Sequence, residues 1–485
     1  MNSYDTIIIG AGIGGLVSAA LLVAAGKHVL LLEQHHGVGG CAATFSHRGF
    51  RFDAGATVGC GFHTDGPMQW LAERLNISWP VLPLPVAWEY CDGNTSISLD
   101  PERRSLIKQF PATESFWGEQ ADVADRLWDL SEILLALYNR GRLQQAASFA
   151  RLLPVKVITP KILQLASMST DRWLQKHDLH KDEEFCRFID AQLLISAQTI
   201  ASSCNALFAA MALDLPRKSP CSIIGGMGTV AETLCKTIIK LGGKVRLGEK
   251  VLSFAIYKGR ISEVLSDKGR YRAREIIFNG SSEGLVSLLD KRVSLSRQTS
   301  NRTSWGAFIL HLGVEQNVLN HLKSPHIQLV REGCTKLAEG ASLFLSASHP
   351  SDTTRAPTGK VPITISTHTS VHPWWEAQQK GKEFYRAMKW QYTETILELL
   401  ERHIKGVRDS INICISGTPL TYARYTGRHL GLVGGYAQER LLPPRQQLFG
   451  LKNCSLVGDS IFPGQSIAAV TVGAIIVIDR LLRRL

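Results

Sequence analysis

The N-terminal part of the chain alternates between apolar runs and short glycine-rich turns. Tyr4–Gly10 is mainly apolar, which predicts a strand buried on both faces. Leu16–Ala25 is a longer apolar run that ends at Gly26, and it predicts a helix with a glycine stop. His28–Leu32 predicts a second buried strand. This order of strand, helix and strand indicates two parallel strands joined by a covering helix.

The hydrophobic pattern changes twice in the middle of the chain. Residues 100–220 show mainly helical spacing, while Trp305–Val314, Ser342–Ser348 and Val361–His368 alternate between two faces. Such alternation predicts strands of an antiparallel sheet. In the first of these strands the expected faces are Phe308, Leu310 and Leu312 on one side and Ala307, Ile309 and His311 on the other. We therefore expect a sheet with helices above it, built mostly from core residues.

The turn between the first strand and the helix carries glycines at the spacing of a dinucleotide-binding loop. Gly10, Gly12 and Gly15 form G-x-G-x-x-G, with Gly14 inside the same turn. The first glycine permits the tight turn, the second lets backbone approach a pyrophosphate, and the third lets the helix pack on the strand. The helix start offers N–H groups and the positive end of its dipole to the phosphates. These four glycines are predicted dinucleotide contacts.

An acidic residue follows the second strand, where a dinucleotide site requires one. Glu33 lies about 20 residues beyond the glycines, where its carboxylate can accept hydrogen bonds from both ribose hydroxyls. The alternative is a solvated charge at the end of a strand. The carboxylate would repel a 2′-phosphate, which disfavours NADP. The strand–helix–strand unit by itself does not distinguish FAD from NAD.

The segment after Glu33 resembles the second flavin contact of the flavin amine oxidase and phytoene desaturase superfamily. That pattern is an acidic residue, a later glycine pair and then D-x-G, represented here by Gly39-Gly40 and by Asp53-Ala54-Gly55. The resemblance implies FAD as the cofactor. It also implies that the backbone of Gly39 and Gly40 lies against the flavin side of the cofactor, because glycine allows close approach.

The C-terminal region resembles the closing flavin motif of the same superfamily, G-D-x-x-x-P-G. A predicted strand, Cys454–Val457, leads into Gly458-Asp459 and a Pro-Gly loop, and an apolar helix follows over Ile467–Ile478. The resemblance implies that Gly458 and Asp459 contact the cofactor, with the carboxylate at the ribityl chain. It places the helix start near the isoalloxazine, where a helix dipole stabilises developing negative charge. The two ends of the chain must then meet in one site.

A third segment is expected to complete the cofactor domain. Ser222–Leu234 resembles the superfamily's G-G-M segment, and Gly243–Val251 predicts a strand whose backbone near Val251 contacts the adenine. The glycines of the G-G-M segment lack an upstream strand and a downstream acid, so no second nucleotide-binding unit is expected. We therefore expect a quinone or oxygen, rather than NAD(P)H, to reoxidise the flavin.

The expected fold is an α/β Rossmann-like FAD-binding domain, discontinuous in sequence, with an inserted α+β substrate domain that contains an antiparallel sheet and a helical cap. A chain of 485 residues exceeds the usual size of one domain. We place FAD-binding parts at residues 1–99, 221–300 and 417–485, a helical substrate or membrane-facing region at 100–220, and the substrate sheet with its helices at 301–416.

The formal net charge of +12 favours an anionic partner. Between Ile133 and Thr170 there is no acidic residue, and basic residues alternate with large apolar ones: Arg140, Arg142, Arg151, Lys156 and Lys161. This pattern suits a surface that enters lipid headgroups, although a solvated helical pair over the substrate domain explains it equally well. No nucleic-acid-binding motif accompanies the charge, so nucleic acid is not an expected partner.

Cysteines and histidines show neither a disulfide nor a metal-ligand pattern. The ten cysteines form no C-x-x-C pair, which indicates reduced thiols of an intracellular protein. No zinc site or other metal site is expected. The longest late apolar run, Ile467–Ile478, has about 12 residues, fewer than the roughly 20 that cross a bilayer. The expected location is cytoplasmic with peripheral membrane association.

Gly417–Gly435, together with the GDSIFPGQS turn, resembles phytoene desaturases, carotenoid isomerases and related carotenoid desaturases. This narrower resemblance implies an apolar polyene substrate and hydride transfer from an allylic C–H to FAD. Cys41 stands where many amine oxidases carry Arg, and no cysteine lies in a context suited to covalent attachment, so non-covalent FAD is expected. The first hypothesis is a carotenoid desaturase. Its rivals are a carotenoid cis–trans isomerase, a polyene saturase that uses reduced FAD, and a non-catalytic membrane-associated flavoprotein.

The sequence assigns no catalytic residue. The cation left by hydride loss is delocalised along a polyene, so orientation, exclusion of water and flavin electrostatics suffice without a dedicated base. Arg424, Tyr425 and Arg428 either border the flavin or a substrate end, or shape a loop. His35 and His36 are acid–base candidates, but their place at a strand end favours surface positions beside the cofactor.

Overall fold

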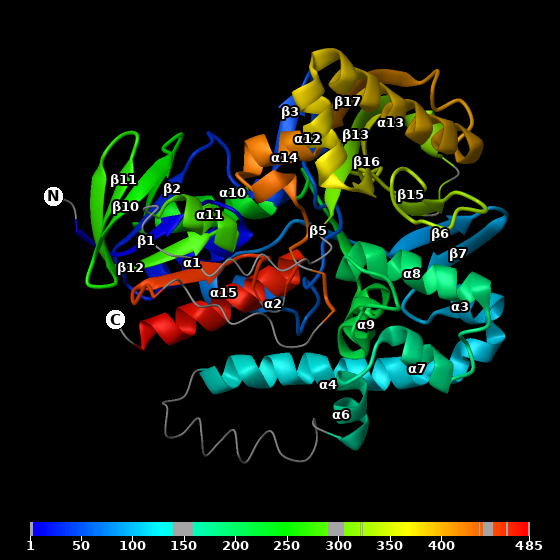
Figure 1. The fold of residues 1–485 in the computed structure, drawn as a ribbon, viewed down its shortest axis with the longest axis horizontal. Helices are drawn as coiled ribbons and strands as arrows, with labels where there is room; N and C mark the ends of the chain where they lie inside the picture. The colour runs from blue at the N-terminus through cyan, green and yellow to red at the C-terminus, as the bar shows by residue number, and fades with distance from the viewer. Residues whose placement is uncertain are drawn as a thin grey trace.

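Two seven-stranded sheets and a group of helices form the three parts of the molecule, which Figure 1 shows side by side. The structure is a computed structural model that describes residues 3–138, 159–289, 305–320, 322, 324–435, 437–439, 450–461 and 464–483. The first sheet lies at the left of the view with both ends of the chain. The second sheet lies at the upper right, and the helices α3 to α9 lie at the lower right.

The first sheet contains the predicted strand–helix–strand unit. β1 (Ser3–Ile9) pairs in parallel with β2 (Val29–Glu33), and α1 (Ile13–Ala24) connects them. β12 (Arg270–Asn279) pairs in parallel with the other side of β1, and β18 (Cys454–Val457) pairs in parallel with β12. The remaining strands are β9 (Lys244–Leu247), β10 (Val251–Tyr257) and β11 (Arg260–Ser266). The strands and the helix predicted from the apolar runs at the two ends of the chain are confirmed.

Helix α1 is buried along nearly its whole length because other helices flank it. α10 (Gly228–Lys240) and α15 (Ile467–Leu482) pack against α1, and α2 (Pro67–Leu75) packs against α15. Buried side chains from these helices, such as Leu16, Ile238 and Ile475, form one apolar cluster. Each such side chain stabilises the fold by roughly 1.5–3 kcal/mol when buried. The cluster therefore holds the start of the chain against its end.

The second sheet has the strand order β17-β13-β16-β15-β14-β6-β7. Its strands are β17 (Ile411–Gly417), β13 (Gly306–Glu315), β16 (Lys360–Thr369), β15 (Ser342–Ala347), β14 (His326–Val330), β6 (Trp88–Asp92) and β7 (Thr95–Leu99). Every pairing is antiparallel except that of β14 with β6. The prediction of antiparallel strands near residues 305–314, 342–348 and 361–368 is confirmed.

The predicted boundary at residue 99 is wrong, because β6 and β7 lie in the second sheet rather than in the cofactor part. The reason is the parallel pairing of β6 with β14, which brings together segments far apart in sequence and leaves no local signal. Two small antiparallel sheets have two strands each. β3 (Thr44–His47) pairs with β4 (Phe50–Asp53), and β5 (Val81–Pro83) pairs with β8 (Cys221–Ile223).

Helices cover both faces of the second sheet. α12 (Val371–Lys380) and α13 (Lys382–His403) lie on one face, where Phe308 stacks on Trp374 with ring centroids 5.4 Å apart. On the other face, Gln192 of α8 (Glu183–Ala197) donates a hydrogen bond to Gln328 of β14 at 2.6 Å. Figure 1 shows the sheet between these helix layers. β13 is accordingly buried on both faces.

The region of residues 100–220 is helical, as predicted. It contains α3 (Arg104–Gln109), α4 (Glu114–Tyr138), α6 (Pro160–Ala166), α7 (Thr170–Lys176), α8 and α9 (Ala206–Ala212). Among the helices that the structure describes, none has the length and apolarity needed to cross a membrane. The basic residues Arg140, Arg142, Arg151 and Lys156 lie outside the described residues.

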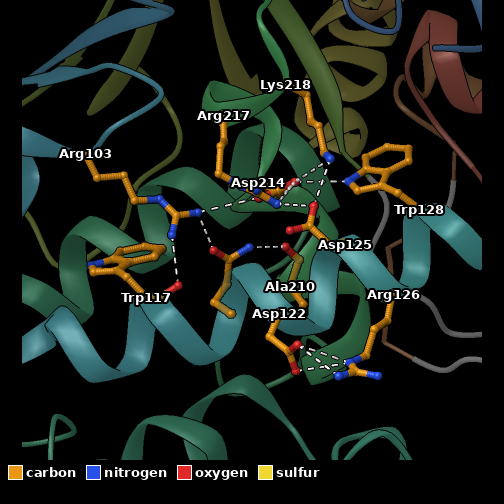
Figure 2. Close-up of polar contacts among 11 residues, drawn as sticks. Arg103, Trp117, Asp122, Asp125, Arg126, Trp128, Ala210, Asp214, Arg217 and Lys218 are labelled. Carbon is orange, nitrogen blue, oxygen red and sulfur yellow. Dashed lines mark hydrogen bonds and ion pairs between the residues drawn. The ribbon is translucent and has the colours of Figure 1, made fainter. Parts of the chain in front are cut away.

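A buried network of charges holds α4 against the turn after α9 (Figure 2). Asp214 is fully buried, and it accepts hydrogen bonds from Arg217 at 2.7 Å and from Trp128 at 3.1 Å. The guanidinium of Arg103 lies 3.6 Å from the same carboxylate, while Asp125 pairs with Lys218 at 3.0 Å. Two carboxylates thus face three cations, so the buried charge of Asp214 is paired although the group carries one net positive charge.

Candidate active site

The glycine loop between β1 and α1 has the geometry that a phosphate-binding turn requires. Gly10 has φ +97°, and a side chain on Gly15 would collide with the carbonyl oxygen of Gly10. This collision is the physical reason for a glycine at the third position, because the helix starts directly on the strand. Gly12 caps α1 without a side-chain hydrogen bond, and the first turn carries no acidic residue. The start of α1 therefore suits an anion.

Asn279, at the end of β12, lies in the middle of this loop. A Cβ atom on Gly12 would lie 2.6 Å from its Nδ2, and a Cβ atom on Gly14 would lie 2.8 Å from its Oδ1. The Asn279 amide also donates to the carbonyl of Gly10 at 3.4 Å. Sequence reasoning missed this residue. The signal was an Asn-Gly pair directly after the buried run Ile276–Phe278.

The C-terminal motif meets the N-terminal loop at this point. A Cβ atom on Gly14 would lie 2.9 Å from the backbone nitrogen of Gly458, and Gly458 itself has φ +113°. β18 reaches this position because it pairs with β12, whose own partner is β1. The expectation that the two ends of the chain form one site is therefore met in the structure.

Glu33 ends β2 with its carboxylate held by backbone groups. Its oxygens accept hydrogen bonds from the N–H of Ala11 at 2.7 Å and from the N–H of His35 at 2.9 Å. The Glu33 carbonyl accepts from the N–H of Glu249 at 2.8 Å, which brings the start of β10 at Val251 close to the same edge of the sheet. The carboxylate is thus fixed beside the glycine loop, where a ribose would lie in the Rossmann arrangement.

The glycine pair packs directly on the fingerprint loop. Gly39 has φ +111°, and its N–H donates to the carbonyl of Ala11 at 2.8 Å. A Cβ atom on Gly40 would lie 3.5 Å from the Cα of Gly12. His36 is exposed and lies against Gly248, which agrees with the predicted surface position for this histidine. The structure thus brings Gly39 and Gly40 together with the glycines of the loop.

Arg428, in the segment Gly417–Gly435, contacts the C-terminal Gly458-Asp459 motif. Its guanidinium forms an ion pair and hydrogen bond with the carboxylate of Asp459, and it also contacts the thiol of Cys41. Burial opposes the charge of Arg428, but Asp459 and Cys41 together raise its pKa. Burial likewise raises the pKa of the Cys41 thiol. The resemblance places Asp459 at the ribityl chain, and the structure pairs it with Arg428. From the sequence alone, Arg428 either borders the site or shapes a loop.

Residues 53–57 lie between the cofactor side and the second sheet. Asp53 accepts hydrogen bonds from the N–H of Met227 at 2.8 Å and from Arg355 at 3.1 Å. The N–H of Ala56 donates to the carbonyl of Cys41 at 3.0 Å. The G-G-M segment therefore contacts Asp53 at the start of α10, where a carboxylate stabilises the N–H groups of a helix start.

These residues fit a bound dinucleotide. The start of α1 has no side-chain cap, and the carboxylate of Glu33 is fixed at the end of β2. The glycines leave open the space beside Asn279 and Gly458 that Cβ atoms would fill. A second helix, α15, begins close by, and its cap Ser466 accepts from the N–H of Ala469 at 3.1 Å. The described residues contain no cluster of His, Cys, Asp or Glu side chains that could hold a metal ion.

The side of the second sheet that faces the cofactor part carries no charge at its centre. Thr364 on this side donates to the carbonyl of Asp53 at 3.4 Å, and Tyr422 beside it donates to the carbonyl of Ala54 at 2.8 Å. Residues directly opposite each other in the strand register share a face. The central positions of this face are Ala307, Ile309, His311, His326, Gln328, Phe344, Ser346, Thr364, Ser366 and His368.

Three histidines on this face are kept neutral by burial. Burial lowers the pKa of His311 to about 4 and that of His368 to about 4. Burial, with the nearby His349, lowers the pKa of His326 to about 3. Phe344, Ser366 and His368 remain partly accessible although they lie in the middle of the sheet, and Trp305 contacts His368 with ring centroids 6.0 Å apart. This neutral and partly aromatic surface suits an apolar ligand.

Comparison with protein families identifies one that spans most of the chain. The family model described as flavin containing amine oxidoreductase matches residues 13–460. Curated relatives include the chloroplastic prolycopene isomerase of Daucus carota, 27% identical over 99% of this chain and 80% of that protein. They also include the lycopene-forming phytoene desaturase of Pseudescherichia vulneris, 24% identical over 97% of both chains. The all-trans-retinol 13,14-reductase of Danio rerio is 22% identical over 98% of this chain and 86% of that protein.

Solved structures share the fold along the whole chain. An oxidoreductase from Methanosarcina mazei superposes with a TM-score of 0.64 at 16% identity and covers 98% of this chain and 99% of its own. Cyclohexylamine oxidase from Brevibacterium oxydans superposes with a TM-score of 0.63 at 15% identity and covers 100% of both chains. At such identities the likeness concerns the fold, an α/β cofactor part joined to a substrate part with a mixed sheet.

Proposed function

Because the chain belongs to the flavin-containing amine oxidoreductase family and is an FAD-dependent oxidoreductase, we propose that it oxidises a long apolar polyene of the carotenoid type by introducing a double bond. Bound FAD supplies the acceptor for the hydride that leaves an allylic C–H. The protein's own residues bind the cofactor, orient the polyene and exclude water.

The observation that carries this proposal concerns the face of the second sheet that is turned toward the cofactor part. The centre of this face carries no charged side chain. An amine substrate is a cation, and a buried cation needs a paired carboxylate. The central positions of this face hold Phe344, hydroxyl side chains and histidines that are neutral at pH 7. A hydrocarbon chain can lie on such a surface without leaving a charge unpaired.

The proposal is tested by anaerobic incubation of the purified flavoprotein with a carotenoid precursor. Desaturation predicts that the flavin absorbance bleaches while the polyene absorption moves to the red. A saturase with oxidised FAD predicts neither change, and with chemically reduced FAD it predicts a shift of the polyene absorption to the blue. Unchanged spectra with every polyene, in both flavin states, would refute the proposed substrate class.

A second candidate is cis–trans isomerisation of a polyene, which the similarity to prolycopene isomerases favours. In that case the double bonds change between cis and trans with no net transfer of electrons. The flavin absorbance is therefore the same before and after a full cycle. Separation of the polyene isomers by chromatography after the same anaerobic incubation distinguishes this outcome. A non-catalytic flavoprotein predicts unchanged polyene in every arm.

The electron acceptor and the location are further parts of the proposal. A quinone or oxygen is the proposed acceptor, and peripheral attachment at a membrane surface on the cytoplasmic side would give access to both quinone and polyene. Leu163 on α6 is 61% exposed, which suits such a surface, whereas the neighbouring Lys161 pairs with Glu119 at 3.1 Å. Liposome flotation tests this idea: charge reversal at Arg140, Arg142 and Arg151 should release the protein from anionic vesicles.

A further inference from the structure

Gln198 is a buried glutamine whose side chain holds an unused hydrogen-bond acceptor. The residue is 6% exposed, and its Oε1 atom is buried with no hydrogen-bond partner among the described residues. A buried polar atom without a partner is destabilising, and nearly all such atoms in folded proteins are therefore paired. The free carboxamide oxygen of Gln198 thus points to a bound group that donates a hydrogen bond to it.

The backbone at the end of α8 fixes the position of this side chain. Gln198 directly follows the helix and has φ +58°, in the left-handed region that usually takes Gly or Asn. The carbonyl of Ala197 accepts from the N–H of Gln438 at 3.0 Å. Nε2 of Gln465 donates to the carbonyl of Ile195 at 3.2 Å. Two C-terminal segments therefore hold the end of α8 from separate sides.

The amide of Gln198 lies close to the position that a side chain on Gly434 would take. A Cβ atom on Gly434 would be 2.7 Å from Nε2 of Gln198 and 2.5 Å from Oε1 of Gln465. A Cβ atom on the next residue, Gly435, would collide with the carbonyl oxygen of Asp459. Gln198 therefore lies one residue along this segment from the contact with the C-terminal cofactor motif.

The strand order of the first sheet gives the direction in which the cofactor extends. Glu33 ends β2 on one side of β1, whereas Asp459 follows β18 on the other side. A ribose at Glu33 and a pyrophosphate at the start of α1 direct the adenosine half of FAD toward β2. The other half must then extend past Gly458 and Asp459. The flavin ring is thereby directed to the side on which Gln198 lies.

The flavin ring carries hydrogen-bonding groups that match a carboxamide. Its pyrimidine edge presents an N3–H donor between the carbonyl acceptors at C2 and C4. A glutamine amide presents an acceptor oxygen beside an NH2 donor. The oxygen can accept from N3–H while the nitrogen donates to an adjacent carbonyl, in the way that an Asn or Gln amide pairs with the edge of a nucleobase.

We propose that Gln198 binds the pyrimidine edge of the flavin, with Oε1 accepting a hydrogen bond from N3–H. The same helix contacts the second sheet through the hydrogen bond of Gln192 with Gln328. α8 would therefore hold the flavin ring in a fixed position relative to the substrate face of that sheet. This contact involves only the cofactor that the family uses, so it is independent of the proposed polyene substrate.

The N3-methyl analogue of FAD tests the contact, because a methyl group replaces the proton that Oε1 would accept. The protein is stripped of flavin, and Kd values for FAD and for the analogue are measured by quenching of flavin fluorescence. We expect the wild-type protein to bind the analogue at least about tenfold more weakly, which corresponds to about 1.4 kcal/mol. Gln198→Ala removes the acceptor and makes space for the methyl group, so its two Kd values should agree within about threefold.

Two results of this titration would overturn the proposal: equal affinity of the wild-type protein for both ligands, or the same Kd ratio in Gln198→Ala. Gln192→Met is the matched control. Gln192 is also a buried glutamine of α8, but its amide is already paired with Trp88 and Gln328. This variant should keep the wild-type ratio, and a loss equal to that of Gln198→Ala would count against a specific contact.

A second arm uses the holoenzyme with Gln198→Glu. The carboxylate still accepts from N3–H, but it opposes the negative charge that reduction adds to the ring. We expect a more negative midpoint potential in a dithionite titration and a preserved preference for FAD over its analogue. An unchanged potential would place this side chain away from the ring and overturn the proposal, even if Gln198→Ala fails to fold. Neither arm uses a polyene, so a protein that transforms none would refute only the proposed function.

Discussion

Gly14 and Gly458 lie so close that a Cβ atom on Gly14 would be 2.9 Å from the backbone nitrogen of Gly458. The two residues come from opposite ends of the chain, and β1, β12 and β18 bring them together as neighbouring parallel strands. The contact leaves no space for a side chain on the loop that fits the pyrophosphate. It also makes the position of the C-terminal motif depend on the identity of a residue near the N-terminus.

Replacement of Gly14 by valine should abolish cofactor binding. The added side chain would displace Gly458 or Asn279, so the loop and the C-terminal motif would separate. We expect the FAD content of the purified protein to fall at least tenfold, which corresponds to about 1.4 kcal/mol or more of binding free energy. Gly37→Ala is the control, since no atom lies within 4 Å of its Cβ position. Full FAD content in Gly14→Val would contradict the assignment of this loop.

Replacement of Arg428 by glutamine should weaken FAD binding through Asp459. The half-buried carboxylate of Asp459 would lose its charged partner, and a charge that is largely removed from water without a partner is destabilising. We expect a higher Kd for FAD by fluorescence titration and a shifted flavin absorbance band in the protein that still binds it. Arg424→Gln changes an exposed arginine of the same segment and should leave both measurements unchanged. Identical results for the two variants would show that Arg428 only shapes the loop.

Replacement of Asp214 by asparagine should destabilise the helical region. Asp214 is fully buried beside Arg103, Arg217 and Lys218, and its neutralisation removes the carboxylate that pairs with Arg103 and leaves Arg217 and Lys218 to share Asp125 (Figure 2). We expect a loss of about 3–5 kcal/mol in the free energy of unfolding by urea denaturation. Asp122→Asn, in an exposed pair with Arg126, should change it by less than about 0.5 kcal/mol.

The buried histidines predict a loss of stability on mild acidification. The folded-state pKa of His368 is lowered to about 4, below the ordinary value of 6.5 that it regains on unfolding. Between these pH values the unfolded chain binds a proton at this histidine that the folded chain does not bind. The histidine's contribution to the free energy of unfolding is therefore fully present above pH 6.5 and is lost as the pH falls from 6.5 to 4.

Each such histidine adds a slope of about 1.4 kcal/mol per pH unit in this window. His368→Gln should reduce the slope of the unfolding free energy by this amount, measured by urea denaturation between pH 7 and pH 5. Carboxylates contribute equally to both proteins, so the difference isolates the histidine. Parallel curves for the two proteins would show that folding does not lower the pKa of His368.

The elements at the two ends of the chain could be predicted because their signals are local. A continuous apolar run, a glycine spacing and a following acid identify β1, α1 and Glu33 without knowledge of distant residues. The same holds for β18 and the Gly458-Asp459 turn. The resemblance to a known superfamily then supplied the expectation that these ends meet.

The remaining features depend on contacts that sequence order hides. β6 joins the second sheet through parallel pairing with β14, and Arg428 finds Asp459 through the packing of two loops. Asn279 has no unusual chemistry of its own, and only its place at the end of β12 brings it to the glycine loop. The Nε2 atom of His326 is buried and has no hydrogen-bond partner among the described residues, and this follows from strand register and burial, neither of which a single sequence reveals.

The strand pairing of the first sheet also has a consequence for synthesis of the protein. β18 is translated near the end of the chain, yet it lies beside β12 and supplies the Gly458 backbone that closes the glycine loop. The emerging polypeptide can form β1, α1 and β2 early, but the dinucleotide site remains open until Cys454–Val457 has left the ribosome. Cofactor loading is therefore a late event, and a chain truncated shortly before β18 would reach nearly full length without a closed site for FAD.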